Sequence, residues 1–288
     1  MPVYMPGENI KLFADDTNIF VTGKSLNQLE EEGNKQLFSI NEWLTANKLH
    51  LNKEKTCYTV FSPTKTKPCS INIKLNGDRL KQVSSCRYLG VVVDDELKWT
   101  AHIETVLQKL NRLVGICYKL CYKLPDWCLH DIFFAFVHSH VLYCIEIYGN
   151  TYGSYLDKLT KVYNKLLRIL QKTGRNCCNE SLYVQYNTLP PVQLFNYQVI
   201  SLVHKTLFTP YLLPTVFQQY FSLNKLSHNY DTRNQSLQLT QHQSRHGFQT
   251  LKFKGSQLWN RLPSDLQETE SPSVFRQLLK YHLIYDPM

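Results

Sequence analysis

The sequence lacks the features that mark several broad classes of protein. It has no CxxC pair, no repeat at a fixed period and no low-complexity stretch, and its first residues lack the basic-then-apolar layout of a signal peptide. Residues 132–148 form the most apolar run, but His138, His140 and Glu146 interrupt it, so a buried helix explains it better than a membrane span. Wholesale disorder is excluded as well, because 43% of the residues are hydrophobic and 12% are aromatic.

Cysteine usage argues against a disulfide framework. The nine cysteines are odd in number and irregularly spaced, so we expect reduced thiols and an intracellular location, in the nucleus or the cytoplasm. The densest group of possible zinc ligands comprises Cys117, Cys121, Cys128, His130, His138 and His140. Structural zinc sites usually have closer ligand pairs, and Cys117 and Cys121 also fit the packed face of a helix. We therefore interpret these residues as packing residues, with zinc binding as the alternative.

The order of local patterns predicts an α+β fold. At 288 residues the chain has room for roughly two units. Strand and helix signals alternate over about the first hundred residues, and helical periodicity with proline breaks follows from Trp99 onward. We expect small antiparallel hairpins with one helix packed across the same small sheet, and then a mostly helical part.

The individual elements follow from periodicity, capping and turn signals. A capping box at Ser25 and Gln28 begins a helix over 25–46, and the Asn76-Gly77 pair predicts a tight hairpin. The expected strands are 9–13, 18–21, 56–61, 71–75, 80–83 and 87–93. The further expected helices are 126–143, 154–172 and about 273–283, and the polar stretch 222–250 is expected to be an exposed loop.

Two carboxylates fall at the tip of the first predicted hairpin. Asp15 and Asp16 lie between the short strands 9–13 and 18–21. Adjacent carboxylates repel each other unless a cation neutralises them, and hard oxygen ligands suit Mg²⁺. A pair of such ions can hold the attacking and leaving oxygens in nucleotidyl transfer. If only these two residues are considered, the alternative is an ordinary Asp-rich turn without a metal ion. We interpret the second acidic pair, Asp94 and Asp95, as such a turn.

Several motifs in order resemble one family. Residues 13–17, FADDT, resemble the Asp-Asp motif of reverse transcriptases, in the form found in non-LTR (LINE-type, Jockey-like) retrotransposon polymerases. Residues 43–49 with 51–56 resemble the next palm motif, and 88–91 with 97–99 resemble the primer grip. Further similar segments are 148–151, 166–170, 232–233 and 258–263, so that the resemblance covers nearly the whole chain.

The resemblance implies a fold and an activity. It implies a partial palm over 1–98, a helical thumb-like region over 99–175 and a C-terminal helical and loop region over 176–288. The family copies an RNA template into DNA from a DNA primer with Mg²⁺, which Asp15 and Asp16 would bind. A Lys near Lys55 is thought to protonate the leaving pyrophosphate, although a solvated lysine is the alternative here. The primer grip would be Tyr88, Leu89 and Gly90.

The same resemblance implies an incomplete polymerase. In this family an upstream palm strand supplies a further Asp to the metals, and fingers residues hold the incoming nucleotide. Only twelve residues precede Phe13. We therefore expect a C-terminal piece that lacks the N-terminal polymerase and endonuclease segments, binds Mg²⁺ weakly and is inactive alone.

A basic stretch indicates nucleic-acid binding. Its side chains recur at three- and four-residue steps, with no acidic residue until Glu180. They are Lys158, Lys161, Lys165, Arg168, Lys172 and Arg175. A nucleic-acid backbone could use them through counterion release, whereas a solvated basic helix or a membrane surface is the alternative. No lipidation signal supports a membrane.

Other residues receive a structural interpretation. Six tyrosines could stack on bases, but we expect most to be core or half-buried: Tyr118, Tyr122, Tyr143, Tyr148, Tyr152 and Tyr155. Both His138 and His140 are interpreted as structural.

Two further functional hypotheses remain beside the polymerase piece. One is a domesticated, non-catalytic module that binds nucleic acid, which a stable, expressed short product would favour. The other is a helical protein-interaction protein, which salt-independent partner binding would favour.

Overall fold

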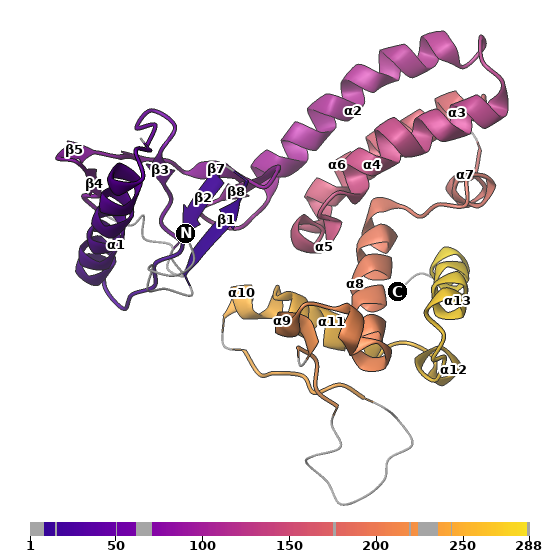
Figure 1. The fold of residues 1–288 in the computed structure, drawn as a ribbon. Helices are drawn as coiled ribbons and strands as arrows, with labels where there is room; N and C mark the ends of the chain where they lie inside the picture. The colour runs from indigo at the N-terminus through magenta and orange to yellow at the C-terminus, as the bar shows by residue number, and fades with distance from the viewer. Residues whose placement is uncertain are drawn as a thin grey trace, which may run out of the picture. The chain divides into compact units, whose positions relative to one another are not determined.

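The computed structural model describes residues 9–14, 16–49, 51–61, 71–174, 177–218, 220–223, 236–242 and 244–286. The chain divides into two compact units, residues 1–97 and residues 98–288. The first unit combines small sheets with one long helix, and the second is helical (Figure 1). The division falls next to the boundary expected at residue 98, and the two expected helical regions lie in one unit. Whether these parts correspond to a palm and a thumb stays a prediction.

The first unit contains four separate two-stranded sheets among its described residues. The antiparallel sheets pair β1 (Ile10–Phe13) with β2 (Asp16–Ile19), β4 (Lys74–Leu75) with β5 (Asp78–Arg79), and β7 (Ser85–Tyr88) with β8 (Val91–Asp94). The fourth sheet pairs β3 (Cys57–Tyr58) in parallel with β6 (Lys81–Gln82). The predicted Asn76-Gly77 hairpin is present, with φ values of 52° and 88° that suit this turn.

Most of the predicted strands differ from the structure. In place of the stretches 18–21, 71–75 and 80–83, the strands are Asp16–Ile19, Lys74–Leu75 and Lys81–Gln82, and β4 pairs with β5 rather than with the stretch 80–83. The stretch 56–61 forms a strand only over β3. The stretch 87–93 is not one strand, because Leu89 and Gly90 form a turn between β7 and β8 with φ values of 45° and 85°. Gly90 adopts positive φ readily, but leucine disfavours it, so only one residue of the pair signals this turn.

Helix α1 (Leu26–Ala46) begins as its capping residues predict. The Ser25 side chain accepts a hydrogen bond from the Gln28 backbone N–H at 3.2 Å, and the Gln28 side chain accepts one from the Lys24 N–H at 2.9 Å. The buried Gly33 lets the helix approach the chain beside β4, since a Cβ there would lie 3.0 Å from the Ile73 Cδ1.

The partner of α1 is not the sheet that we predicted. The helix packs against β4, whereas β1 and β2 form a sheet of their own. The side-chain amide of Asn34 holds this arrangement: its Nδ2 donates to the Asn72 carbonyl at 3.0 Å, and its Oδ1 accepts from the Lys74 N–H at 2.8 Å. These contacts join residues about forty positions apart, which periodicity cannot reveal.

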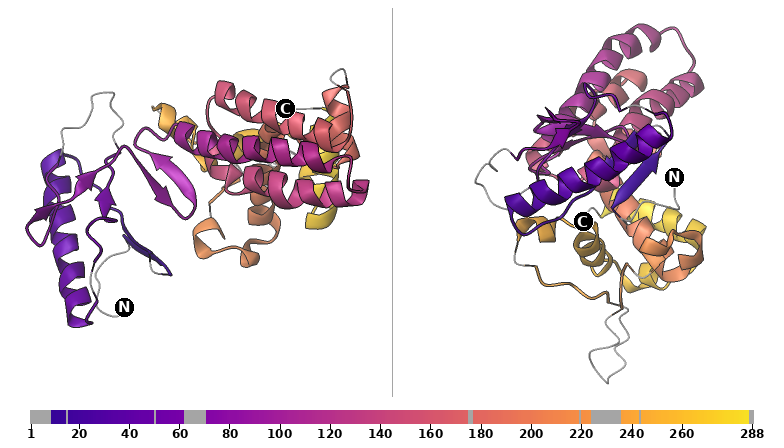
Figure 2. Two further views of the ribbon diagram at one scale, coloured as in Figure 1. Left: turned by 90° about the horizontal axis from the view of Figure 1, so that it is seen from above. Right: turned by 60° about the vertical axis from the view of Figure 1, so that its left-hand side comes forward.

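The second unit begins with three helical segments side by side (Figure 1, Figure 2). The first segment is α2 (Thr100–Leu120), and the third is α6 (Gly153–Leu170), which the short α5 (Ile145–Tyr148) precedes. The second is a continuous run of three elements: α3 (Asp126–Ile132), the π-helical η1 (Phe133–His138) and α4 (Ser139–Leu142). The expected helices 126–143 and 154–172 are therefore present with slightly different ends.

Helix α8 (Pro191–Phe208) contacts several of the remaining helices. These remaining helices are α7 (Asn179–Gln185), η2 (Pro210–Leu212), α9 (Thr215–Gln218), α10 (Arg245–Phe248), α11 (Leu251–Trp259), α12 (Ser264–Gln267) and α13 (Pro272–Tyr285). Helix α8 contacts α5, α6, α11 and α13. The predicted tail helix is α13. Residues 224–235 of the expected loop 222–250 lie outside the described residues, and Leu237 within it is buried rather than exposed.

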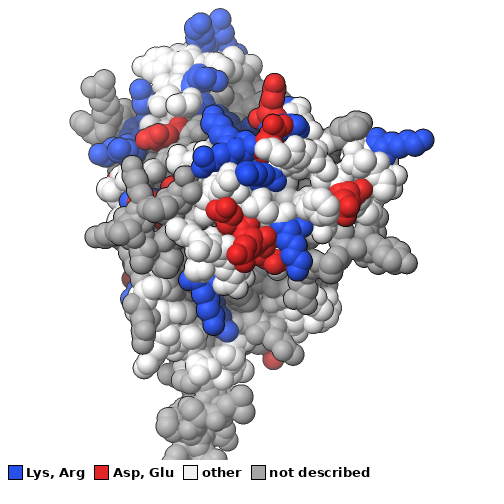
Figure 3. Space-filling model, turned by 90° about the vertical axis from the view of Figure 1, so that its left-hand side faces the viewer, with Lys and Arg blue, Asp and Glu red and all other residues white. Residues whose placement is uncertain are grey.

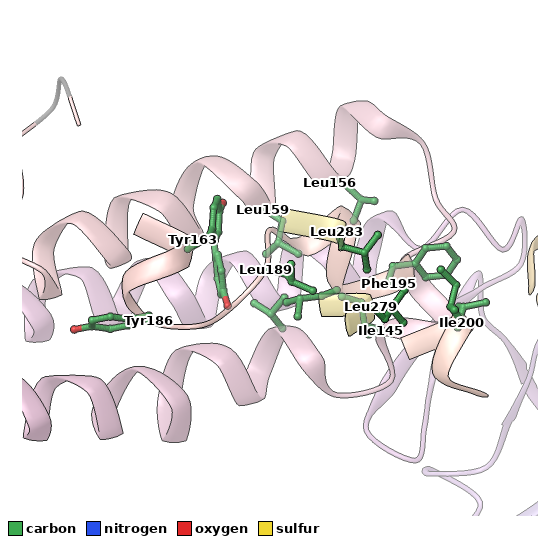
Figure 4. Close-up of a cluster of buried hydrophobic side chains, with 14 of the residues drawn as sticks. Ile145, Leu156, Leu159, Tyr163, Tyr186, Leu189, Phe195, Ile200, Leu279 and Leu283 are labelled. Atoms are coloured by element: carbon green, nitrogen blue, oxygen red, sulfur yellow. The ribbon is translucent and has the colours of Figure 1, made fainter. Parts of the chain in front are cut away.

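Buried aliphatic and aromatic side chains connect these helices (Figure 4). Leu159 and Tyr163 of α6 lie in the same cluster as Phe195 of α8 and Leu279 of α13. The Tyr163 hydroxyl is hydrogen bonded to the His138 Nδ1 at 2.8 Å and lies 3.2 Å from the Thr188 Oγ1. Within the described residues, every helix falls short of the length and apolarity that a bilayer crossing requires.

Candidate functional site

The hairpin of β1 and β2 presents one of the two predicted metal ligands. Phe13 pairs with Asp16 in the antiparallel register, and Ala14 begins the connection between the two strands. Asp16 begins β2 and its side chain is exposed, which leaves its carboxylate oxygens accessible to a hard cation such as Mg²⁺. Asp15 lies outside the described residues. Ala14 adopts a φ of 51°, a left-handed conformation that tight two-residue hairpin turns require.

No complete metal cluster accompanies this hairpin in the part of the chain that the structure describes. There, no group of three or more His, Cys, Asp or Glu side chains is placed to hold a metal ion. This holds for the Cys and His group around Cys117 and His138, all of whose members are described. All eight described cysteines are free thiols.

An aromatic contact brings the Asp-bearing hairpin to the predicted primer-grip hairpin. The ring of Phe20, directly after β2, meets the ring of Tyr88 edge to face, with centroids 6.1 Å apart. Tyr88 is half-buried and precedes the Leu89-Gly90 turn between β7 and β8. The two motifs are 68 positions apart in the sequence, from Phe20 to Tyr88, and meet through a residue that sequence reasoning missed.

Lys55 lies in a turn between α1 and β3. Its side chain is exposed, and its backbone N–H donates to the Asn52 Oδ1 at 3.2 Å. The Asn52 carbonyl also accepts from the Thr56 hydroxyl at 2.8 Å, so Asn52 fixes the turn that carries Lys55. The neighbouring Lys53 is paired with Asp78. No described contact links Lys55 to the Asp-bearing hairpin, and its catalytic role stays a prediction.

The basic face of α6 is only partly available to a ligand. Lys158, Lys161 and Lys165 are exposed. In contrast, the Arg168 guanidinium donates to the Asn179 Oδ1 at 2.5 Å, and the Lys172 Nζ lies 2.7 Å from the Asp126 carboxylate.

These contacts correct the expectation of six equivalent cations on one helical face. The helix ends at Leu170, and Lys172 follows with a φ of 55°. Arg175 lies outside the described residues. The partners of Arg168 and Lys172 come from α7 and α3, which the spacing of α6 could not disclose. The cations open to an anionic ligand are therefore Lys158, Lys161 and Lys165.

Charge is mixed on the face drawn in Figure 3. Basic and acidic side chains both occur there, in small groups of each sign that lie beside one another. A nucleic-acid contact therefore has to be argued from particular helices rather than from the net charge of +9 alone.

The tyrosines divide differently from the expectation. Tyr148 is fully buried, and Tyr152 and Tyr155 are half-buried with their rings 5.9 Å apart. Tyr118 and Tyr122, however, are 62% and 78% exposed, and Tyr143 is also exposed. The expectation that most of the six are core or half-buried is therefore wrong.

The two histidines have perturbed acidity. Burial, with a contribution from the charge of Lys280, lowers the pKa of His138 to about 4. The hydrogen bond of this ring to Tyr163 supports the structural interpretation. Burial and the charge of Lys109 lower the pKa of His140. Both rings are therefore held neutral near pH 7.

Comparison with known proteins gives one consistent group of relatives. Over 162 residues the chain is 26% identical to the RNA-directed DNA polymerase from mobile element jockey of Drosophila melanogaster, which covers 55% of this chain and 18% of that protein. Over 161 residues it is 22% identical to a probable RNA-directed DNA polymerase from transposon BS of the same fly, again 55% of this chain and 18% of that protein. A Pol polyprotein from the type-1 retrotransposable element R1 4 of Nasonia vitripennis is 26% identical over 198 residues, 62% of this chain and 50% of that protein.

These matches confirm the resemblance to Jockey-like non-LTR retrotransposon polymerases over 55% to 62% of this chain, whereas the motifs indicate it over nearly all of the chain. The chain spans less than a fifth of the length of the two fly relatives and half of the wasp relative. No family model matches the chain, and no solved structure matches it.

Proposed function

We propose that this chain supplies the Asp-bearing part and the helical part of an RNA-directed DNA polymerase of a non-LTR retrotransposon. The observation that carries the proposal is the position of Asp16 at the tip of the β1–β2 hairpin, in a chain similar to polymerases of the jockey, BS and R1 elements. In the intact protein the reaction is nucleotidyl transfer, in which a primer hydroxyl displaces pyrophosphate from a nucleoside triphosphate on an RNA template.

The donor set of the hairpin fits a hard divalent cation. Asp16 offers exposed carboxylate oxygens and Asp15 precedes it directly, and Mg²⁺ prefers such ligands. Bound there, Mg²⁺ would neutralise negative charge on the phosphates during the transfer. The contribution of this chain is to supply two carboxylates on adjacent residues, of which Asp16 begins β2.

The hairpin also supports the proposal that other segments of the polymerase complete the site. Two strands alone are marginally stable in water, and Leu12 and Phe13 of β1 are 49% and 62% exposed. Further strands packed on this hairpin would cover these side chains and add the third carboxylate of a two-metal site. We therefore propose that the 288-residue chain by itself does not extend a primer.

Nucleic acid is the proposed partner of two surfaces. The β7–β8 turn at Leu89 and Gly90 stands next to the Asp-bearing hairpin through the Phe20–Tyr88 contact, as a primer-binding element requires. Lys158, Lys161 and Lys165 of α6 are the proposed contacts to phosphates, since they are exposed and lie on one helical face.

A chimera tests the catalytic proposal. The polymerase segment that precedes the matched region in the Nasonia relative is joined to this chain, and extension of a DNA primer on an RNA template is measured with Mg²⁺. We expect extension by the chimera, its loss in Asp15→Ala and Asp16→Ala, and its retention in Asp95→Ala, which removes a carboxylate from a structural turn. The chain alone should show none.

Two results would contradict the proposal. One is primer extension by the isolated chain above the level of its Asp15→Ala variant. The other is a chimera that remains fully active when Asp16 is replaced. Circular dichroism of each variant separates loss of chemistry from loss of fold.

A further inference from the structure

The outer side of α2 carries cations that sequence reasoning passed over. Its inner side is buried through Ile103, Val106, Leu110 and Cys117. On the outer side four exposed cations recur at helical spacing: Lys109, Arg112, Lys119 and, just past the helix end, Lys123. No acidic residue occurs between Glu104 and Asp126. An anionic partner therefore matches this side of α2 in charge.

Three large aromatic side chains are exposed at the C-terminal end of the same helix. Tyr118 and Tyr122 are 62% and 78% exposed, and Trp127 at the start of α3 is 69% exposed. Figure 1 shows the short turn that joins the end of α2 to the start of α3. Exposed rings of this size can stack on bases, and three of them fall within ten residues of the chain.

The one acidic group among these residues is already engaged. Asp126 lies between the turn and Trp127, and its carboxylate is 2.7 Å from the Lys172 Nζ of the segment after α6. The ammonium groups of Lys119 and Lys123 are consequently not balanced by it. Cations thus alternate with aromatic rings from Arg112 to Trp127.

We propose that the C-terminal half of α2 and the start of α3 bind an unpaired nucleic-acid strand, a specificity that rests on the nucleic-acid role proposed above. Bases stack on Tyr118, Tyr122 and Trp127, while Lys119 and Lys123 contact phosphates. Tyr118 and Tyr122 are one helical turn apart, a rise of about 6 Å, which is nearly twice the spacing of about 3.4 Å along one strand of a duplex. The rings therefore suit bases that are no longer stacked on each other.

Binding of the full chain to two probes tests the assignment. The probes are a labelled 20-nucleotide single strand of mixed sequence, as DNA and as RNA, and the corresponding duplex. The test variant combines Tyr118→Leu, Tyr122→Leu and Trp127→Leu. The control variant removes three aromatic rings of similar exposure elsewhere in the unit, by Tyr211→Leu, Tyr281→Leu and Tyr285→Leu.

We expect the test variant to bind the single strand at least tenfold more weakly, because each base–aromatic stack alone accounts for about fivefold or more. Its salt dependence should stay that of the wild type, since no cation is lost, and its duplex affinity should change less than about twofold. The control variant should behave as the wild type. Trp127→Phe should keep the affinity and lose the fluorescence quenching that the single strand causes.

Four outcomes would overturn the assignment. The first is that the triple variant binds the single strand and the duplex with equally reduced affinity. If the triple variant melts at a lower temperature, the same comparison is made with Tyr122→Leu alone. The second is that the triple variant binds the single strand as the wild type does, while neutralisation of Lys158, Lys161 and Lys165 weakens that binding. This result would contradict the assignment of the rings but not the proposed function. The third is a changed oligomeric state in sedimentation without a change in nucleic-acid binding, which assigns the rings to a protein interface. The fourth is a wild-type chain that binds neither probe, which overturns both proposals.

Discussion

Neutralising the open cations of α6 should change how binding depends on salt. The variant carries Lys158→Gln, Lys161→Gln and Lys165→Gln and leaves Arg168 and Lys172 in place, because those two hold α7 and α3. If each of the three lysines neutralises one phosphate of a duplex, the slope of log affinity against log salt should fall by about 2.7, at about 0.9 per phosphate. Between 50 and 200 mM salt, a fourfold change, the wild type should lose about 40-fold more affinity than the variant.

Fluorescence anisotropy with a labelled 20-base-pair duplex measures this slope. The matched control removes the same number of charges elsewhere in the unit, by Lys205→Gln, Arg261→Gln and Arg276→Gln. Stability should change little, because the three α6 lysines are exposed and only Lys158 has a described partner, the ring of Tyr155 at 5.8 Å. A slope that falls by less than about 1, or by the same amount in the control, would refute the assignment of these lysines to phosphates.

Three further perturbations test the packing that supports these surfaces. Gly149→Ala should destabilise the helical unit by about 1–3 kcal/mol in urea unfolding, because the new Cβ would lie 2.6 Å from the Ile145 carbonyl oxygen and 2.7 Å from the Phe195 ring. Since the folded state lowers the pKa of His138 from 6.5 to about 4, the unfolded chain binds a proton first as the pH falls. Stability should therefore be full above pH 6.5 and decrease by about 3 kcal/mol down to pH 4. Asn34→Ala should destabilise the first unit by about 1–3 kcal/mol, measured by the fluorescence of Trp43, because two hydrogen bonds to the backbone beside β4 are lost.

Each of these has a matched control. Gly153→Ala meets no atom within 4 Å and should leave stability almost unchanged, so an equal loss in both glycine variants would contradict the steric argument. His138→Asn should flatten the decrease between pH 6.5 and 4, and an unchanged pH profile would assign that decrease to other groups. Ser39→Ala removes only a bond within α1, to the Lys35 carbonyl, and should cost less than Asn34→Ala.

The sequence predicted elements whose signals are local. Ser25 with Gln28 gave the start of α1, Asn76 with Gly77 gave the β4–β5 turn, and the alternation around the Asp pair gave the β1–β2 hairpin. In each case the deciding residues are at most a few positions apart, so their chemistry acts within one turn. The Leu89-Gly90 turn was missed because Leu89 carries no turn signal and the single Gly90 stands within an otherwise strand-like run.

What the sequence could not predict depends on contacts between distant segments. The Asn179 and Asp126 partners that occupy Arg168 and Lys172 lie on other helices, and the Phe20–Tyr88 contact joins two hairpins. The exposure of Tyr118 and Tyr122, in contrast, could have been predicted from the sequence. A helical projection of α2 separates them from the buried side, which carries Ile103, Leu110 and Cys117. That signal was available in the sequence and was outweighed by the general tendency of tyrosine to be half-buried.

Strand β4 pairs with β5 along one edge, and along its other edge the side-chain amide of Asn34 takes the hydrogen bonds that a further strand would make. A helix residue thus closes that border of the sheet against growth, which protects the protein from edge-to-edge association with copies of itself. Among the described residues, no third strand joins β1 and β2. Strand addition is therefore blocked at this edge of β4. At the hairpin of Asp16, a foreign strand would compete with the polymerase segments that we propose complete the site.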